Sequence, residues 1–243
     1  MKHIWLIRPS ELGGLMTQGR KKEELWGDTA MKIIQKNVLF HKYGIEEPRV
    51  MTKEMDKGIY NEAQNLELAA KIFGYLDVNT NAPKKRLVND YFIGEPDHDG
   101  NELVDIKSSF SAMTFPWFEN PCNKAYEYQL QAYMDLTGKD EAELVYVLSN
   151  HPDHLIRSEI KRLTYYYVDR PHEFDLIESI DHLWAVAEEK ATEIVMREAK
   201  VSHIPEEKRV RRFIIKRDNE IIEQMHQRVI DARKIFDELI KTI

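Results

Sequence analysis

The segment from 94 to 109 constrains the fold of this chain more than any other stretch. It reads G-E-P-D-H-D-G-N-E-L-V-D-I-K-S-S. Turn-forming residues at 97–100 precede a short apolar run at 103–106, which predicts a hairpin whose returning arm is a strand. Residues two apart on a strand point to the same face, so Asp105 and Lys107 share a face while Ile106 points the other way. Asp97 then lies at the mouth of the hairpin.

Two carboxylates and one ammonium in this arrangement have a defined chemistry. Carboxylates are hard oxygen ligands that suit Mg²⁺ or Mn²⁺. Such a metal can polarise a phosphodiester and activate a water molecule, and a nearby lysine can orient that water or stabilise the developing charge. The alternative is a surface hairpin with an Asp–Lys ion pair, because a bare D-x-K recurs by chance. The surrounding sequence has to decide between the two.

Composition narrows the class of protein. The 243 residues suit one large domain, and the single cysteine, Cys122, excludes an intrachain disulfide and fits a reducing compartment. No apolar run approaches the roughly 20 residues of a membrane span. The first nine residues are too short and too broken for a signal peptide, so we expect a cytosolic protein without a membrane partner.

Charge also excludes one class of protein. The net charge is −7, from 35 Lys and Arg against 42 Asp and Glu, which argues against a nonspecific nucleic-acid coating protein. Local basic segments remain at 20–22, 84–86 and 208–217. The last reads K-R-V-R-R-F-I-I-K-R and carries Arg209, Arg211 and Arg212. It fits either a phosphate-binding strand or a strand with a solvated basic face.

Periodicity predicts helices at 29–40, 52–73, 123–137, 171–200 and 219–241, and strands at 86–93, 103–106, 144–148, 155–168 and 210–215. The 52–73 helix has an apolar stripe from Ile59 to Phe73, with Glu62 beside it. Ser10 is a candidate helix cap. The order of elements predicts an α/β fold with a small central mixed sheet flanked by helices.

This order, with G-E-P-D ahead of V-D-I-K, resembles the PD-(D/E)xK nuclease superfamily and its restriction-endonuclease-like core. Three further segments narrow the resemblance to the lambda-exonuclease-like phage recombination nucleases. They are M-D-K-G-I-Y-N-E ending at Glu62, Y-E-Y-Q-L-Q-A-Y-M at 126–134 and I-R-P-S-E-L-G-G-L-M at 7–16. The resemblance covers residues 7–150, with a looser match beyond them. It implies one nuclease domain over 1–243, with its core at about 50–150 and the remaining helices appended.

The resemblance implies a metal site and a lysine that handles the attacking water. The Mg²⁺ or Mn²⁺ ligands would be the carboxylates of Glu62, Asp97 and Asp105 and the backbone carbonyl of Ile106. Lys107 would handle the water, and Gln129 would position that lysine or the water. The second acid is Asp105 where the phage enzyme has glutamate, and this shorter side chain can change the metal spacing. His98, next to Asp97, has two alternatives: a place near the metal, or the solvent-facing position that is expected for a histidine in a turn.

The resemblance also implies contacts with DNA and an activity. Arg8 and Ser10 would hold the 5′ phosphate. The expected activity is a metal-dependent exonuclease that degrades one strand of linear duplex DNA from its 5′ end. Relatives of this kind include trimers, so a homo-oligomer is expected, with a single-strand annealing protein as a partner.

Two other functions stay open. One is a DNA-end-processing or CRISPR-adaptation type of PD-(D/E)xK nuclease, although that group often carries a cysteine cluster for an iron–sulfur centre and this chain has one cysteine. The other is a catalytically inactive DNA-binding or phage-structural protein on the same fold. The presence of both acids and the lysine argues against such decay.

Overall fold

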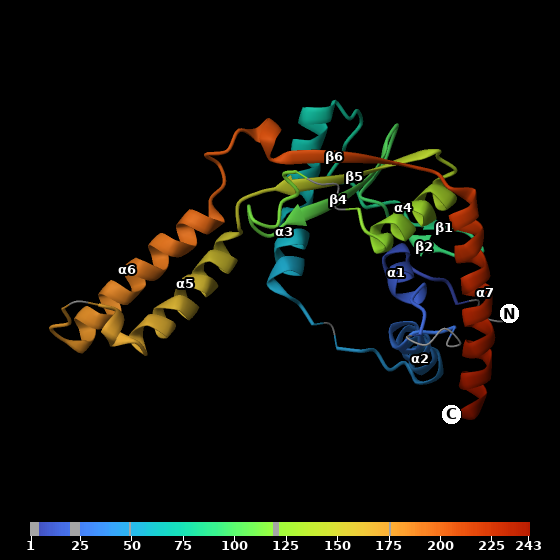
Figure 1. Ribbon diagram of the computed structural model, residues 1–243. Coiled ribbons are helices and arrows are strands. Elements are labelled where there is room, and N and C mark those ends of the chain that lie inside the picture. The colour runs from blue at the N-terminus through green and yellow to red at the C-terminus, as the bar shows by residue number, and fades with distance from the viewer. Residues whose placement is uncertain (1–4, 20–24, 49, 119–121, 175) are drawn as a thin grey trace.

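The computed structural model describes residues 5–19, 25–48, 50–118, 122–174 and 176–243. Its centre is a four-stranded mixed sheet in the order β3-β4-β5-β6 (Figure 1). The strands are β3 (His98–Asp99), β4 (Leu103–Ser109), β5 (Glu141–Leu148) and β6 (Val210–Lys216). β4 and β5 run parallel, while the two outer pairs are antiparallel. The predicted mixed α/β sheet is confirmed.

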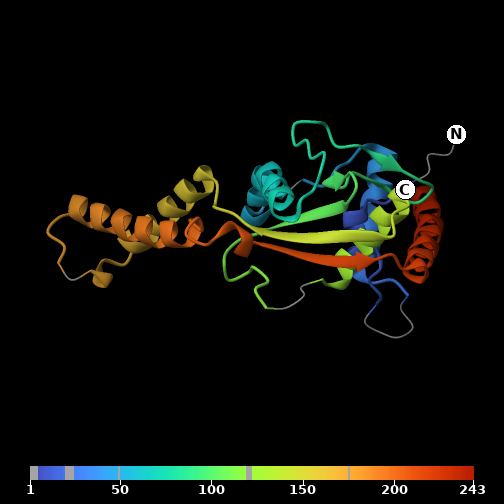
Figure 2. The same cartoon turned by 90° about the horizontal axis from the view of Figure 1, so that it is seen from above.

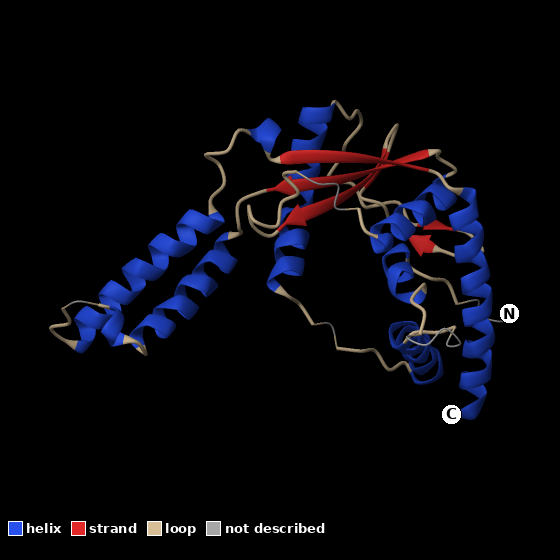
Figure 3. Cartoon of the chain, viewed as in Figure 1, coloured by secondary structure: helices blue, strands red, loops and turns tan. Residues whose placement is uncertain are grey.

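Helices cover both faces of this sheet (Figure 3). α4 (Lys124–Thr137) is the crossover that the parallel β4–β5 pair requires, and its Leu130 and Met134 pack on Leu103 and Leu144. α3 (Lys53–Phe73) packs on the opposite face, where Ala69 meets Val104 and Val145 in a separate apolar cluster. The β4 arm of the hairpin expected from the sequence therefore lies between two helices.

A second core joins the two ends of the chain. The short elements η1 (Pro9–Glu11) and α1 (Leu12–Leu15) pack with α2 (Asp28–Tyr43) and α7 (Asn219–Thr242). Arg228 of α7 donates to the carbonyls of Leu15, Thr17 and Leu25. These hydrogen bonds hold the N-terminal segment against the last helix.

The expected strand at 86–93 is wrong as a single element. It is a hairpin of β1 (Leu87–Val88) and β2 (Ile93–Gly94), which pair antiparallel. The side-chain oxygen of Asn89 accepts from the backbone N–H groups of Tyr91 and Phe92, at 2.9 and 2.8 Å, and so closes the turn. An asparagine that bonds its own backbone in this way interrupts an extended segment.

The expected strand at 155–168 is also wrong. This segment is α5 (Asp153–Val168), and it forms a helical arm with α6 (Ile180–Ala199) that projects away from the sheet (Figure 2). Ile156, Ile160 and Leu163 recur at helical spacing and pack on α6. The β-forming tyrosines 165–167 obscured this period. α6 starts later than predicted because Ser179 caps it, and residues 171–173 form the separate turn η2 (Pro171–Glu173). η3 (Glu206–Lys208) leads from the arm into β6.

The first half of the buried face of α3 is polar rather than apolar. Ile59, placed on the inward stripe from the sequence, is 53% exposed, whereas Lys57, Asn61 and Asn65 are buried. The Lys57 ammonium donates to the carbonyl oxygens of Ser109 and Phe110 at 2.9 and 2.8 Å. Asn61 donates to Ser149 Oγ and to the Asn150 carbonyl at 2.9 and 2.8 Å. These side chains satisfy carbonyls where β4 and β5 end, which fixes α3 along the sheet.

None of the described helices is both long and apolar enough to cross a bilayer.

Lys57 provides a test of this polar face. Replacing it with Met should destabilise the protein by about 1–3 kcal/mol near neutral pH, because two buried carbonyls lose their donor. Burial also lowers the pKa of Lys57 to about 8. The unfolded chain, with an ordinary lysine pKa near 10.5, then binds more protons between these values. The contribution of Lys57 to the free energy of unfolding should therefore rise from about pH 8 to about pH 10.5.

The measurement is chemical denaturation of the wild type and Lys57→Met at several pH values. Lys71→Met is the matched control, since Lys71 is on the same helix with its side chain 67% exposed. A stability difference between wild type and Lys57→Met that does not grow above pH 8 would contradict the assignment.

Candidate active site

The hairpin places Asp97 at an open edge of the sheet. β3 pairs only with Leu103 and Val104, so the rest of β4 extends beyond it on that side. Asp97 lies directly before β3, and its Oδ2 accepts from the backbone N–H of Ile106 at 2.7 Å. The carboxylate therefore takes the position of the next ladder partner. In an extended strand the N–H and C=O of one residue project to the same edge, so the Ile106 carbonyl faces the same side as Asp97.

Asp105, Lys107 and Gln129 form a closed network. Lys107 Nζ lies 2.7 Å from Asp105 Oδ2 and donates to Gln129 Oε1 at 3.1 Å. Gln129 Nε2 in turn donates to Asp105 Oδ1 at 2.8 Å. Asn123 caps α4 by accepting from the Tyr126 N–H, and the Tyr126 ring centroid lies 4.8 Å from Lys107 Nζ. This arrangement is the geometry that the predicted positioning role of Gln129 requires.

The network contains a buried carboxylate paired with an ammonium. Asp105 is 4% exposed. Burial raises the pKa of its carboxyl to about 6, against the opposing effect of the Lys107 charge. Burial alone would lower the pKa of Lys107, but the Asp105 carboxylate outweighs it and leaves the lysine pKa above its ordinary value. Lys107 is therefore an ammonium at neutral pH, and it acts as a hydrogen-bond donor and a positive charge.

Glu62 lies at the same edge, where Lys84 bridges it to Asp97, a position of Lys84 that the sequence did not predict. The Lys84 ammonium lies 2.7 Å from Glu62 Oε1 and 2.6 Å from Asp97 Oδ1. Lys84 belongs to the connection between α3 and β1, and in the sequence it was visible only as part of the basic segment 84–86. Its charge was apparent there, but its position between two acids depends on tertiary contacts.

The donor atoms at this edge suit a divalent cation. Three carboxylates and one backbone carbonyl are hard oxygen ligands of the kind that Mg²⁺ and Mn²⁺ take. Asp105 Oδ2 is paired with Lys107 but accepts no well-aligned hydrogen bond from any described residue. Within the described part of the chain, no three His, Cys, Asp or Glu side chains are grouped so that they could hold a metal as they stand. The donor types fit the ion, but in this structure Lys84 lies between Glu62 and Asp97, and Lys107 is paired with Asp105.

A cleft of about 1020 Å³ extends from the N-terminal segment toward this hairpin. Arg8 and Ser10 line one part of it, and Glu95 and Tyr133 line another. Ser10 does not cap a helix as expected. It lies inside η1, where Arg8 occupies the cap position and no side chain caps the turn. Arg8 is exposed and makes no ion pair with any residue that the structure describes. The cleft thus joins the two predicted phosphate contacts to the residues that precede Asp97.

The basic strand does not present its arginines together. Arg211 and Arg212 are neighbours on β6, so they point to opposite faces. Arg211 donates to the Pro116 carbonyl, while Arg212 lies 3.3 Å from Glu143 Oε1 and 4.5 Å from the centroid of the Phe73 ring. Arg209 lies before the strand and is half-buried. The structure therefore separates Arg211 and Arg212 onto opposite faces of the sheet.

His98 differs from the expectation of a solvent-facing turn residue. It is buried, and its ring stacks on Tyr75 with centroids 6.1 Å apart. Burial lowers the pKa of this histidine. His98 belongs to β3 and is the cross-strand partner of Val104. Paired residues share a face of the sheet, so the His98 side chain lies on the same buried face as Val104 and Tyr75.

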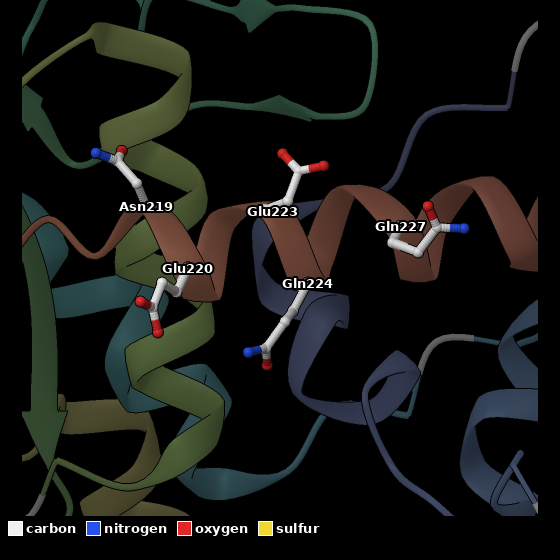
Figure 4. Close-up of a pocket in the computed structure, with 5 residues that line it drawn as sticks. All are labelled: Asn219, Glu220, Glu223, Gln224 and Gln227. Atoms are coloured by element: carbon white, nitrogen blue, oxygen red, sulfur yellow. The ribbon is translucent and has the colours of Figure 1, made fainter.

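A separate hollow of about 590 Å³ lies along the first turns of α7 (Figure 4). It is lined by Asn219, Glu220, Glu223, Gln224 and Gln227. All of these residues come from one helix, and none belongs to the hairpin or to the cleft. The hollow contributes nothing to the site at β4.

Solved structures of other proteins resemble this chain over nearly its whole length. No protein-family model and no curated protein matches the sequence. A phage-related exonuclease from Haemophilus somnus 129PT has a similar structure, with a TM-score of 0.69 at 24% identity, covering 99% of this chain and 97% of that chain. The chain has the fold of this exonuclease.

A second solved structure with this fold is an alkaline exonuclease from Laribacter hongkongensis. It matches with a TM-score of 0.58 at 13% identity, covering 98% of this chain and 91% of the other. The same enzyme in complex with dAMP matches with a TM-score of 0.55 at 12% identity, covering 98% and 90%. Because nearly the whole chain is covered in each comparison, the helical arm and the terminal helices belong to the shared fold.

A substitution at Gly94 tests the close contact between η1 and β2 in the cleft. A Cβ at this position would lie 2.9 Å from the Pro9 ring and 3.0 Å from Tyr133 Cε1, so Gly94→Ala should push η1 away from β2. We expect a loss of about 1–3 kcal/mol in the free energy of unfolding, as for an overpacked site. The Ile93 amide, which donates to the Ile7 carbonyl at 3.0 Å, should exchange hydrogen faster.

The matched control is Gly58→Ala. A Cβ there meets nothing within 4 Å, and the residue lies inside α3, so alanine should raise stability by up to about 1 kcal/mol. If Gly94→Ala leaves both stability and Ile93 exchange unchanged, the close contact between η1 and β2 is refuted.

Proposed function

We propose that this chain is a metal-dependent DNA exonuclease that hydrolyses phosphodiester bonds from the 5′ end of linear duplex DNA. The observation that carries the proposal is the Asp105–Lys107–Gln129 network beside Asp97, on a fold shared with exonucleases over almost the entire chain. The dAMP complex of the Laribacter enzyme supports a nucleotide as the ligand class.

In this proposal Glu62, Asp97, Asp105 and the Ile106 carbonyl hold Mg²⁺ or Mn²⁺. When bound, the ion would supply Lewis-acid polarisation of the phosphodiester and a lower pKa for water. Burial raises the pKa of the Asp105 carboxyl, and the Lys107 charge opposes this effect and so favours the ionised form that a metal ligand requires.

Lys107 is assigned the role of a charge-stabilising donor. Its raised pKa keeps it protonated, so it does not take the proton of the attacking water. An ammonium at this position can instead donate to the attacking water or to a phosphate oxygen and offset the negative charge that develops in the transition state. Gln129 holds the ammonium through a neutral amide, which fixes its direction without adding a charge.

The cleft supports a place for the 5′ end. Arg8 offers an exposed guanidinium suited to bidentate phosphate contacts, whereas Arg86 and Lys36 in the same cleft pair with Glu95 and Glu11. Arg8 and Ser10 would hold the terminal phosphate while the next phosphodiester reaches Asp97. The resemblance further suggests a trimeric assembly and a single-strand annealing partner in phage-type recombination, which we include in the proposal.

The function is tested by digestion of linear, nicked and closed circular duplexes, each with Mg²⁺ or with EDTA. The linear substrate is supplied with and without a 5′ phosphate. We expect degradation of linear DNA only, faster with the 5′ phosphate and absent in EDTA. Asp105→Asn should cut at least ~100-fold more slowly, because one charge of the metal site is lost, but should still bind linear duplex.

Other outcomes identify the alternatives. Cutting of closed circles would replace the exonuclease by an endonuclease of the same fold. Binding of DNA by the wild type without any cleavage in Mg²⁺ or Mn²⁺ would indicate an inactive DNA-binding protein. Near-wild-type turnover by Asp105→Asn would remove Asp105 from the active site.

A further inference from the structure

Lys84 lies where two acids from distant segments meet. Its Nζ is 2.7 Å from Glu62 Oε1 on α3 and 2.6 Å from Asp97 Oδ1 ahead of β3. Both distances are those of charge-assisted hydrogen bonds. Without a cation between them the two carboxylates would repel each other, so the ammonium stabilises their approach.

The position of this ammonium excludes a second cation. A divalent metal that used Glu62 and Asp97 together would sit within about 2.0–2.6 Å of an oxygen from each. The Lys84 nitrogen occupies that volume, since it contacts one oxygen of each carboxylate. The two cations cannot share the place, so metal binding by this pair requires Lys84 to leave.

The surroundings of Lys84 allow it to leave. It lies in the irregular connection between Phe73 and Leu87, and its side chain is 32% exposed. Among the described residues its side chain is held by Glu62 and Asp97 alone. A flexible stem with a compact charge can then turn toward solvent or toward a phosphate.

We propose that Lys84 is an internal counter-ion that holds Glu62 and Asp97 together in the metal-free protein and is displaced when a divalent cation binds. This inference rests on the proposed function, because it concerns the metal site of that function. It assigns Lys84 a positioning role, distinct from the role proposed for Lys107, which pairs with Asp105 and Gln129.

The test is direct Mn²⁺ binding, measured by calorimetry or by the EPR signal of free Mn²⁺, without DNA. Lys84→Met keeps the length of the stem and removes the charge. We expect it to bind Mn²⁺ about tenfold more tightly than the wild type, because no ion pair has to be broken. In EDTA its Tm should fall, because the two carboxylates then repel, and the rise in Tm on adding Mn²⁺ should exceed that of the wild type.

Two further variants complete the design. Lys84→Gln should behave like Lys84→Met, and it replaces that variant if Lys84→Met does not fold. Lys85→Met removes the adjacent exposed lysine and should match the wild type in both measurements. An unchanged or weaker Mn²⁺ affinity in both Lys84 variants overturns the inference, as does a failure of wild type and variants alike to bind Mn²⁺.

Asp105→Asn separates this inference from the function itself. If the metal site is the proposed one, Asp105→Asn weakens Mn²⁺ binding in the wild-type background. Binding that ignores Asp105 would count against the proposed function, whatever the Lys84 variants show. Binding that depends on Asp105 but ignores Lys84 would overturn only the role of Lys84.

Discussion

Burial of the Asp105 carboxylate is the constraint on which the site depends. A charge with 4% exposure is costly unless cations and donors surround it. Lys107 supplies the charge from the same strand face, and Gln129 supplies an amide from α4. The amide can reach only because the parallel β4–β5 pair sends α4 across that face of the sheet. The hydrogen bond that stabilises the buried carboxylate therefore depends on the parallel topology of β4 and β5.

The second requirement is an open strand edge. β3 ends its pairing at two residues of β4, and the carboxylate of Asp97 satisfies the next backbone N–H. On the other face, Lys57 and Asn61 tie α3 to the ends of β4 and β5. This polar anchoring brings Glu62 to the same edge, where Lys84 balances its charge. Glu62 and Asp97 therefore share one ammonium at this edge, while Asp105 pairs with Lys107 on β4.

The sequence predicted the parts of this structure that depend on local pattern. The presence of a hairpin, the α4 boundaries at Asn123 and Gly138, and the α/β class were readable from turn residues, caps and periodicity. The turn of the hairpin was misplaced, because it lies at 100–102 and not at 97–100. The inward face of α3 could not be predicted in this way, because the hydrogen-bond acceptors that allow Lys57 and Asn61 to be buried lie more than fifty residues away in the sequence. Lys84 was missed for the same reason. In 155–168 the β-forming tyrosines masked a helical spacing that tertiary packing on α6 selects.

The proposed active site is tested most directly by measuring whether Lys107 and Gln129 act as one unit in cleavage. Single-turnover cleavage of a 5′-phosphorylated duplex would compare Lys107→Ala, Gln129→Ala and the double variant. Gln131→Ala is the control, because Gln131 lies on the same helix but bonds Lys216 and Asp218. Lys107→Ala should be slower by about 100-fold or more, and Gln129→Ala by less. If the residues act as one unit, the double variant is as slow as Lys107→Ala alone. If the rate losses of the two single variants multiply in the double variant, Gln129 acts independently of Lys107, which would contradict the proposed role of the network.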